Sequence, residues 1–137
     1  MSNIVKKIKP FVTTFSPQFN HVEKHGNVET IGGKIVRVLR ASDVLEEVSD
    51  DEMSSGVYLT IDDDIGEMSI YLPRSVSETF ENKNGPFTLG TLVLAQGRVH
   101  VLNTVHESIM NNGNKSITHI SPNETIRLLA YTLIPIS

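Results

Sequence analysis

The stretch VYLTIDDDIGEMSIYL, residues 57–72, decides the fold class of this chain. Two short runs alternate between apolar and more polar residues, and a segment rich in Asp and Gly, 62–66, separates them. Such alternation is typical of strands that bury one face, and short acidic residues with a glycine suit a tight turn. The stretch therefore predicts a β-hairpin, whose core face carries four apolar side chains: Leu59, Ile61, Met68 and Ile70.

The segments around this hairpin predict further elements. KIVRVLR (34–40) is rich in β-branched residues and predicts a strand before the hairpin. Residues 74–81 predict a short helix, which Asn84-Gly85-Pro86 brings to an end. Two long apolar segments predict two more strands, TLVLAQGRVHVLN (91–103) and TIRLLAYTLIPI (125–136).

The order of these elements predicts the architecture. Five strands with one short helix between the third and the fourth are the order of the OB-fold, a small Greek-key barrel. We therefore expect an all-β fold with one short helix, a five-stranded Greek-key OB-fold barrel. Gly97, inside the fourth strand, indicates a bulge or a kink. Val93 and Leu129 are expected to join the core residues of the hairpin.

Residues 1–27 have a different character. Pro10 and Pro17 oppose a long helix, so we expect a partly extended N-terminal arm on an OB-fold domain of residues 28–137. Phenylalanines recur at a spacing of four in this arm, and we expect them to pack on the barrel rather than to bind a ligand; they are Phe11, Phe15 and Phe19.

Two polar segments interrupt the strands. DVLEEVSDDE (43–52) is densely acidic, which favours a solvated loop and leaves open a docking segment for a basic partner protein. Residues 104–124 are polar, with a strong turn signal at 111–114. We interpret them as a small inserted hairpin with arms at 106–110 and 116–120.

Composition excludes several function classes. The chain has 137 residues, enough for one domain with its own core, and no cysteine. Disulfides, cysteine metal ligands and cysteine nucleophiles are thereby excluded. We expect a cytoplasmic location, with no signal peptide, because no apolar run follows the basic N-terminus. No apolar run reaches the roughly 18 residues of a membrane span, so no membrane partner is expected.

Charge is unevenly distributed along the chain. The net charge of −4 opposes a general polycation that coats DNA. Residues 1–40 nevertheless carry seven Lys or Arg against two Glu, while residues 41–70 carry ten acids and no Lys or Arg. This distribution leaves open a locally positive surface that binds a nucleic acid.

Three short motifs, in order, carry a resemblance to a known family. They are Gly33-Lys34-Ile35, the segment 58–66 that ends in Asp-Asp-Asp-Ile-Gly, and Leu89-Gly90-Thr91-Leu92-Val93 with Gly97-Arg98-Val99. Together they resemble nucleic-acid-binding OB-fold domains of the tRNA-anticodon and replication-protein-A type, over roughly residues 28–136. Anticodon-binding members often carry Arg where this chain has Asp62, which argues against tRNA in particular.

That resemblance implies a binding surface on the outer face of the second and third strands. Alternation places two tyrosines and two hydroxyl residues there, and the tyrosines would stack bases. Lysine and arginine on neighbouring strands would pair with phosphates. The alternative is that both tyrosines are half-buried sheet residues under the N-terminal arm. The candidate nucleic-acid-binding residues are Lys34, Arg37, Arg40, Tyr58, Thr60, Ser69, Tyr71 and Arg98.

Rival chemistries have weaker support in the sequence. His21 and His25 are four residues apart, but no H-E-x-x-H motif accompanies them, so we expect no metal and no cofactor. No Gly-rich phosphate loop, nucleophile elbow or triad context is present, so we expect no enzyme.

We therefore predict a non-catalytic module that binds single-stranded nucleic acid, DNA more than RNA. The alternatives are a protein-interaction OB module, with 43–52 or the sheet edge as its working surface, and a structural subunit of a larger assembly. The fold alone does not choose among them, and the oligomeric state is left open.

Overall fold

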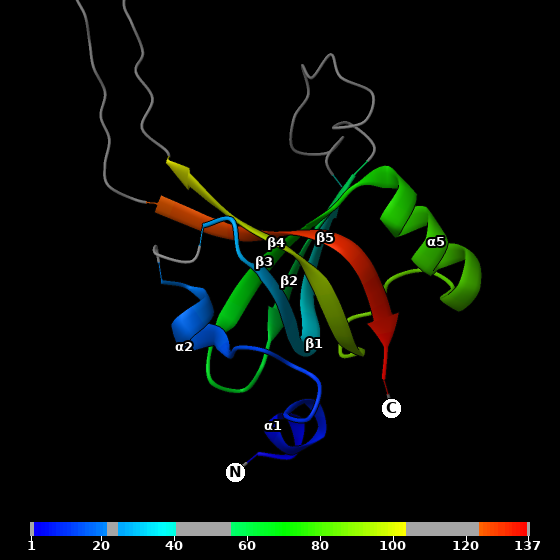
Figure 1. Ribbon diagram of the computed structural model, residues 1–137. Coiled ribbons are helices and arrows are strands. Elements are labelled where there is room, and N and C mark those ends of the chain that lie inside the picture. Colours follow the sequence, from blue (N-terminus) through cyan, green and yellow to red (C-terminus); the bar gives the residue numbers. More distant parts are fainter. Residues whose placement is uncertain (1, 22–24, 41–55, 104–123, 137) are drawn as a thin grey trace, which may run out of the picture.

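The computed structural model of this protein describes residues 2–21, 25–40, 56–103 and 124–136. Five strands form the body, one helix lies between the third and fourth strands, and two short helices precede the body (Figure 1). In chain order the elements are α1 (Asn3–Ile8), α2 (Ser16–Phe19), β1 (Val28–Arg40), β2 (Val57–Asp62), β3 (Glu67–Leu72), α5 (Arg74–Asn84), β4 (Leu92–Asn103) and β5 (Glu124–Pro135).

The strands close into a barrel in the order β1-β2-β3-β5-β4. β2 and β3 pair antiparallel as the predicted hairpin, and β1 pairs antiparallel with both β2 and β4. β5 closes the barrel by pairing parallel to β3 and antiparallel to β4. The predicted all-β class, the five strands and the position of the helix are confirmed.

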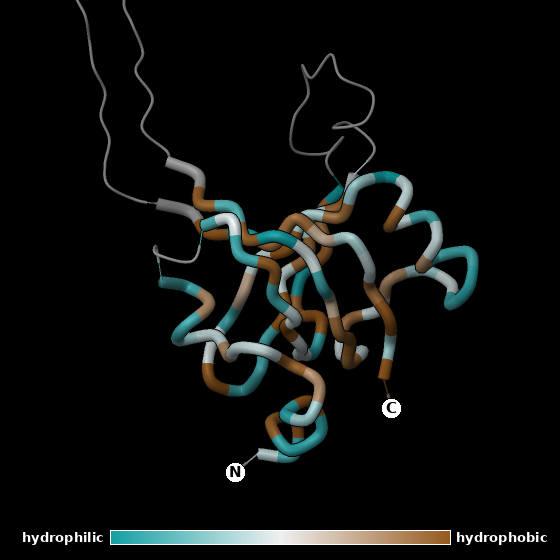
Figure 2. The backbone as a smooth tube through the Cα atoms, viewed as in Figure 1, coloured by the Kyte–Doolittle hydropathy of each residue, from teal (hydrophilic) through white to brown (hydrophobic). Residues whose placement is uncertain are grey.

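The barrel interior holds the apolar core, which includes five of the six residues predicted to be buried. Leu59, Ile61, Met68, Ile70 and Val93 are each 2% exposed or less. The prediction for Leu129 is wrong: its side chain is half-buried, while its neighbours Leu128 and Ala130 face the core. β5 is largely apolar along its length (Figure 2). Alternation therefore did not reveal which of its faces is inside.

Two glycines lie where strands cross closely. A Cβ atom on Gly33 would lie 2.6 Å from the Asp62 carbonyl oxygen, and one on Gly97 would overlap the Leu129 carbonyl oxygen. The β4–β5 register shifts between Gln96 and Gly97, which confirms the predicted irregularity. β1 begins at Val28, six residues before the expected start, because Gly33 and its neighbour Gly32 are part of the strand.

The helix between β3 and β4 ends where the stop signal predicts. α5 runs to Asn84, three residues beyond the expected helix, and Gly85 follows at a φ of 86°, a conformation that favours glycine. Phe80 of this helix is 4% exposed and belongs to the core, and its ring stacks on that of Phe87 with centroids 5.0 Å apart.

The N-terminal segment forms two short helices and packs on the barrel. Ile8 of α1 and Phe19 of α2 are fully buried, whereas Phe11 is 55% exposed. Packing is therefore confirmed for Phe19 and wrong for Phe11. The segment is more helical than expected, since both prolines lie outside helix interiors: Pro10 follows α1, and Pro17 is in the first turn of α2. The domain boundary after residue 27 stays a prediction.

A buried carboxylate joins this segment to the β2–β3 turn. Asp63 is fully buried and accepts hydrogen bonds from the Ser16 backbone N–H at 2.8 Å and the Ser16 hydroxyl at 2.9 Å. It also accepts from the backbone N–H groups of Ile65 and Gly66, each at 2.9 Å. The same side chain thus shapes the turn and holds α2 against it.

Two predicted features lie outside the described residues. They are the acidic segment 43–52 and the inserted hairpin of residues 104–124, of which only residue 124, the first of β5, is described. Within the described part of the chain, no helix has the length and apolar character needed to cross a membrane.

Candidate nucleic-acid interface

The strand register aligns outward-facing residues of all five strands. An inward row runs Val38, Leu59, Ile70, Leu128 and Val99, and all but the first are buried. Since successive side chains alternate in direction, the rows on either side face outward. We call these two rows together the outer band: the first row is Arg37, Thr60, Ser69, Arg127 and His100, and the second is Leu39, Tyr58, Tyr71, Leu129 and Arg98.

The outer band contains six of the eight candidate residues. Thr60 and Ser69 are cross-strand partners in the first row, and both are half-buried. Their hydroxyl groups lie between Arg37 on β1 and Arg127 on β5 in the register. Hydroxyls and arginines in one row are suited to phosphate oxygens, because every one of them can donate a hydrogen bond.

The two tyrosines meet across the hairpin, but they differ in exposure. Their ring centroids are 5.0 Å apart with an interplanar angle of 52°. Tyr58 is half-buried, whereas Tyr71 is 9% exposed, so its expected role as an exposed platform is wrong. The Tyr71 ring lies close to the backbone of Gly56, where a Cβ atom would be 2.6 Å from Cε1 of the ring. Tyr58 remains the stacking candidate.

Arg127 lies in the first row of the outer band, on β5 between Ser69 and His100, and sequence reasoning missed it. Its Cζ atom lies 5.0 Å from the centroid of the Tyr58 ring, a cation–π distance. The small side chain of Ser69, its register partner on β3, leaves room for this reach. The Arg127 Nε atom is buried and has no hydrogen-bond partner among the described residues. A lone arginine inside the apolar segment 125–136 was the available signal.

The other arginines divide by what they contact. No hydrogen bond or ion pair to another described residue is made by Arg37, which is exposed. Arg98 donates from Nη1 to the Gly26 carbonyl oxygen at 2.7 Å and from Nε to the Tyr131 hydroxyl at 3.0 Å. Arg98 belongs to the outer band, but two of its nitrogen atoms already donate hydrogen bonds within the protein.

The predicted phosphate contact of Arg40 is not supported by its position. Its Nη2 atom lies 2.7 Å from Oε2 of Glu81 on α5, and its Cζ lies 5.7 Å from the Phe87 ring centroid. The register pairs Arg40 with Val57, whose side chain faces the core, so Arg40 points to the barrel end that α5 covers. Arg40 and Glu81 therefore form a structural ion pair at the edge of the helix.

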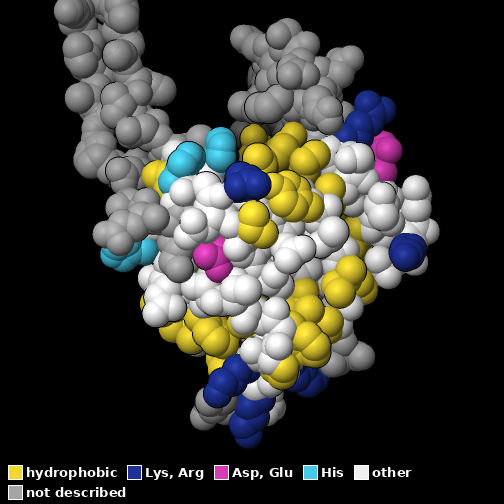
Figure 3. All heavy atoms as spheres, viewed as in Figure 1, with side chains coloured by type: hydrophobic (Ala, Val, Ile, Leu, Met, Phe, Trp, Pro, Cys, Tyr) yellow, Lys and Arg dark blue, Asp and Glu magenta, His cyan; other side chains and the backbone are white. Residues whose placement is uncertain are grey.

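Lysine is also less concentrated at the band than the charge pattern suggests. Lys34 is half-buried, and its register partner is Asp62, which lies opposite Glu67. Lys6, Lys7 and Lys9 are exposed on and just after α1, which packs on β1 beside Gly32. The Lys and Arg side chains at the lower end of the molecule lie over α1 (Figure 3).

His25, which precedes β1, lies beside His100 of the outer band. The rings of His25 and His100 have centroids 5.3 Å apart, and the Val101 backbone N–H donates to His25 Nδ1 at 2.8 Å. The pKa of His100 is lowered by burial, then by His25 and by Arg127. Figure 3 shows histidine side chains beside an Arg or Lys side chain on this face. His21 and His25 are not joined by a third ligand, since no group of three metal-binding side chains occurs among described residues.

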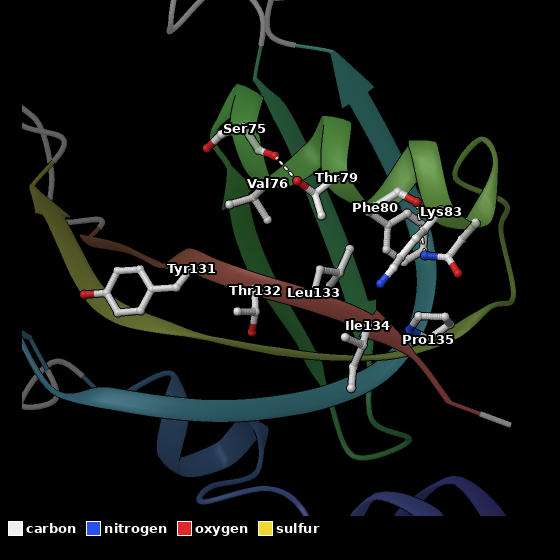
Figure 4. A pocket seen from close by; sticks show the side chains of 11 residues that line it. Ser75, Val76, Thr79, Phe80, Lys83, Tyr131, Thr132, Leu133, Ile134 and Pro135 are labelled. Atoms are coloured by element: carbon white, nitrogen blue, oxygen red, sulfur yellow. Dashed lines mark hydrogen bonds between the residues drawn. The ribbon is translucent and has the colours of Figure 1, made fainter.

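A separate hollow of about 670 Å³ lies between α5 and β5 (Figure 4). Val76 and Phe80 of the helix face Leu133 of the strand, and Lys83 supplies one charge at its rim. None of the eight candidate residues lines this hollow.

Comparisons with known proteins bear on the fold. No family model matches the sequence, and no curated protein matches it. An OBody bound to hen egg-white lysozyme matches the structure with a TM-score of 0.57 and 11% identity, over 93% of this chain and 94% of that chain. The chain is an OB-fold domain.

Larger proteins contain a similar domain. Asparaginyl-tRNA synthetase from Pyrococcus horikoshii matches with a TM-score of 0.55 and 16% identity, over 90% of this chain and 22% of that chain. A putative aspartyl-tRNA synthetase from Leishmania major Friedlin gives 0.51 and 9%, over 89% and 20%. The chain thus spans about a fifth of the length of these synthetases. At these identities the likeness concerns the OB fold alone.

The usual ligand surface of an OB fold is the outer face of its second and third strands. In this OB-fold domain that surface carries Tyr58, Thr60 and Ser69, which lie in the outer band. The outer band continues beyond this surface onto β5 and β4. There Arg127 adds a positive charge and His100 adds a ring that can be protonated.

Proposed function

We propose that this OB-fold domain is a non-catalytic module that binds single-stranded nucleic acid, DNA more than RNA, along the outer band. One observation carries the proposal. Of the five arginines, the two with no hydrogen bond or ion pair to a described residue are Arg37 and Arg127, and both lie in the first row. An arginine without a carboxylate partner is available to phosphate.

The charges around these two arginines support the same function. The ten positions of the outer band hold three arginines and one histidine, and no Asp or Glu. Described acids lie elsewhere, for example Asp63 in the β2–β3 turn and Glu81 on α5. Local potential steers a charged ligand, so a chain with a net charge of −4 can still attract a polyanion at this band.

Bases would bind through Tyr58 together with Arg127. The guanidinium already lies over the tyrosine ring, and bases stack on both aromatic rings and arginine planes. Stacking on such a platform contributes about 1–3 kcal/mol per base and tolerates any sequence. Thr60 and Ser69 would donate to phosphate or sugar oxygens between the two arginines.

The test is a fluorescence-anisotropy titration with labelled oligo-dT, oligo-U and a DNA duplex at two salt concentrations. We expect oligo-dT to bind most tightly, and Tyr58→Ala to weaken it by about 1–3 kcal/mol. Phe11→Ala is the matched control, because Phe11 is an exposed aromatic residue away from the band. Absence of oligo-dT binding at low salt, or equal loss from both variants, would contradict the proposal.

One observation favours a second function. The OBody that matches this fold is bound to lysozyme, a protein. A protein-interaction module that uses the acidic segment 43–52 is therefore the alternative. It takes precedence if no oligonucleotide binds, and a pull-down with the intact and the neutralised segment would then test it.

A further inference from the structure

We propose that Arg127, His100 and His25 form a phosphate-binding subsite at the β5–β4 end of the outer band, and that phosphate bound there brings a proton onto His100. The inference rests on the proposed function in taking the phosphate from a nucleic-acid strand. The subsite lies beyond the β2–β3 surface that OB folds usually use.

The geometry brings the three side chains together from separate parts of the chain. Arg127 on β5 and His100 on β4 are register partners in the first row, so they face outward side by side. His25 precedes β1, and its ring lies against that of His100 with centroids 5.3 Å apart. The Arg98 guanidinium holds the Gly26 carbonyl, which fixes the backbone next to His25.

Arg127 gives the subsite a permanent charge that nothing in the described chain neutralises. Its guanidinium contacts the face of Tyr58 and makes no hydrogen bond to a described residue, and its Nε atom is buried. Arg40 and Arg74, by contrast, each pair with a glutamate. A half-buried cation without a counter-charge stabilises an anion that binds beside it, because screening by water is reduced there.

The backbone orients the His25 ring. Its Nδ1 atom accepts a hydrogen bond from the Val101 N–H at 2.8 Å, so Nε2 is the ring atom left to donate. His25 therefore adds an N–H donor next to His100. Together with the guanidinium, this gives an anion donors from two different segments.

His100 is the group whose charge can change. Among the described residues, the charged or titratable groups that face it from other elements are His25 and Arg127, and Arg98 lies in the next row of its own strand. Burial and these two neighbours lower the pKa of His100, which keeps the ring neutral near pH 7. A phosphate between them would oppose the repulsion and raise the pKa.

Binding and proton uptake are then linked. Affinity should rise as pH falls from the pKa of His100 in the complex to its lower pKa in the free protein, and level off below that. Each unit by which phosphate raises this pKa corresponds to about a tenfold change in affinity across the window.

The experiment is an NMR titration of the histidine ring protons of the full chain at constant ionic strength. It is run with the protein alone, with inorganic phosphate and with oligo-dT. We expect both ligands to raise the His100 pKa. Arg127→Gln should raise that pKa in the free protein, by removing a neighbouring charge, and should abolish the further rise with ligand. His21→Gln is the control, because His21 lies outside the band, and it should change neither result.

The outcomes separate this inference from the proposed function. If oligo-dT binds and the His100 pKa stays where it was, the subsite is wrong and the proposed function stands. If oligo-dT does not bind and inorganic phosphate still raises the pKa, the subsite stands and the proposed function falls. If the His100 pKa changes with neither ligand and is the same in Arg127→Gln, the subsite is wrong. The wild-type titration decides this even if Arg127→Gln does not fold.

Discussion

Replacing Arg37 and Arg40 separately, each with glutamine, should change the salt dependence of oligo-dT binding in only one of the two variants. The two residues are three positions apart on β1, but Arg37 faces outward in the first row and Arg40 pairs with Glu81 at 2.7 Å. If Arg37 contacts one phosphate, its loss should flatten the slope of log affinity against log salt by about 0.7. Arg40→Gln should leave that slope unchanged.

The size of the effect follows from that slope. Between roughly 50 and 200 mM salt, one phosphate contact on a single strand accounts for about a 2.6-fold change in affinity. The wild type should therefore lose about 2.6-fold more affinity over this range than Arg37→Gln does. Arg40→Gln should instead cost stability, by about 0.2–1 kcal/mol, because its ion pair is solvent-exposed.

The assay is anisotropy at four or more salt concentrations, with a thermal melt of each variant. Both variants keep the same number of residues and lose the same charge, so each controls for the general effect of the other. Equal slopes for Arg37→Gln and the wild type would refute the assignment of Arg37 to phosphate. A flattened slope for Arg40→Gln would show that its ion pair opens to bind the strand.

Three further substitutions test the fold and the band. Ile61→Asp should abolish cooperative melting, because burying an unpaired carboxylate costs several kcal/mol, comparable with a total stability of about 5–15 kcal/mol; a melt within a few degrees of wild type would contradict its place in the core. Asp63→Asn should lower the free energy of unfolding by about 2–4 kcal/mol, because the amide presents a donor to one of the N–H groups that Asp63 accepts from. In the same denaturant titration, Asp64→Asn is the matched control at an exposed position and should cost far less. Tyr71→Ala should lower the melting temperature as a cavity in packed structure does, while Tyr58→Ala mainly weakens oligo-dT; the reverse assignment would mean that the two rings exchange roles.

Local patterns were sufficient for the barrel because one face of each hairpin strand is strictly apolar. Leu59 and Ile61 on β2 and Met68 and Ile70 on β3 leave only one register that buries all four. The same logic failed at Leu129, because β5 is apolar on both faces and shape, not polarity, decides which face is inside.

The candidate site was predicted where alternation applied and missed where contacts come from distant segments. Thr60 and Ser69 followed from the hairpin pattern, and they lie in the outer band. Tyr71 lies close to the Gly56 backbone, Arg40 pairs with Glu81, and Arg127 reaches Tyr58 across β3. None of these contacts can be derived from spacing along the chain, because each depends on how the barrel closes.

The way β5 closes this barrel has a consequence for synthesis on the ribosome. β5 supplies both the parallel seam with β3 and the long antiparallel seam with β4, and it is the last of the five strands to be translated. Until residues 124–135 emerge, a nascent chain has an open sheet with β3 and β4 at its edges, and their backbone groups are unpaired. Such edges pair readily with strands of other chains. Nascent molecules on neighbouring ribosomes are therefore most prone to aggregate before β5 emerges, and a chaperone that shields strand edges should raise the yield of folded protein.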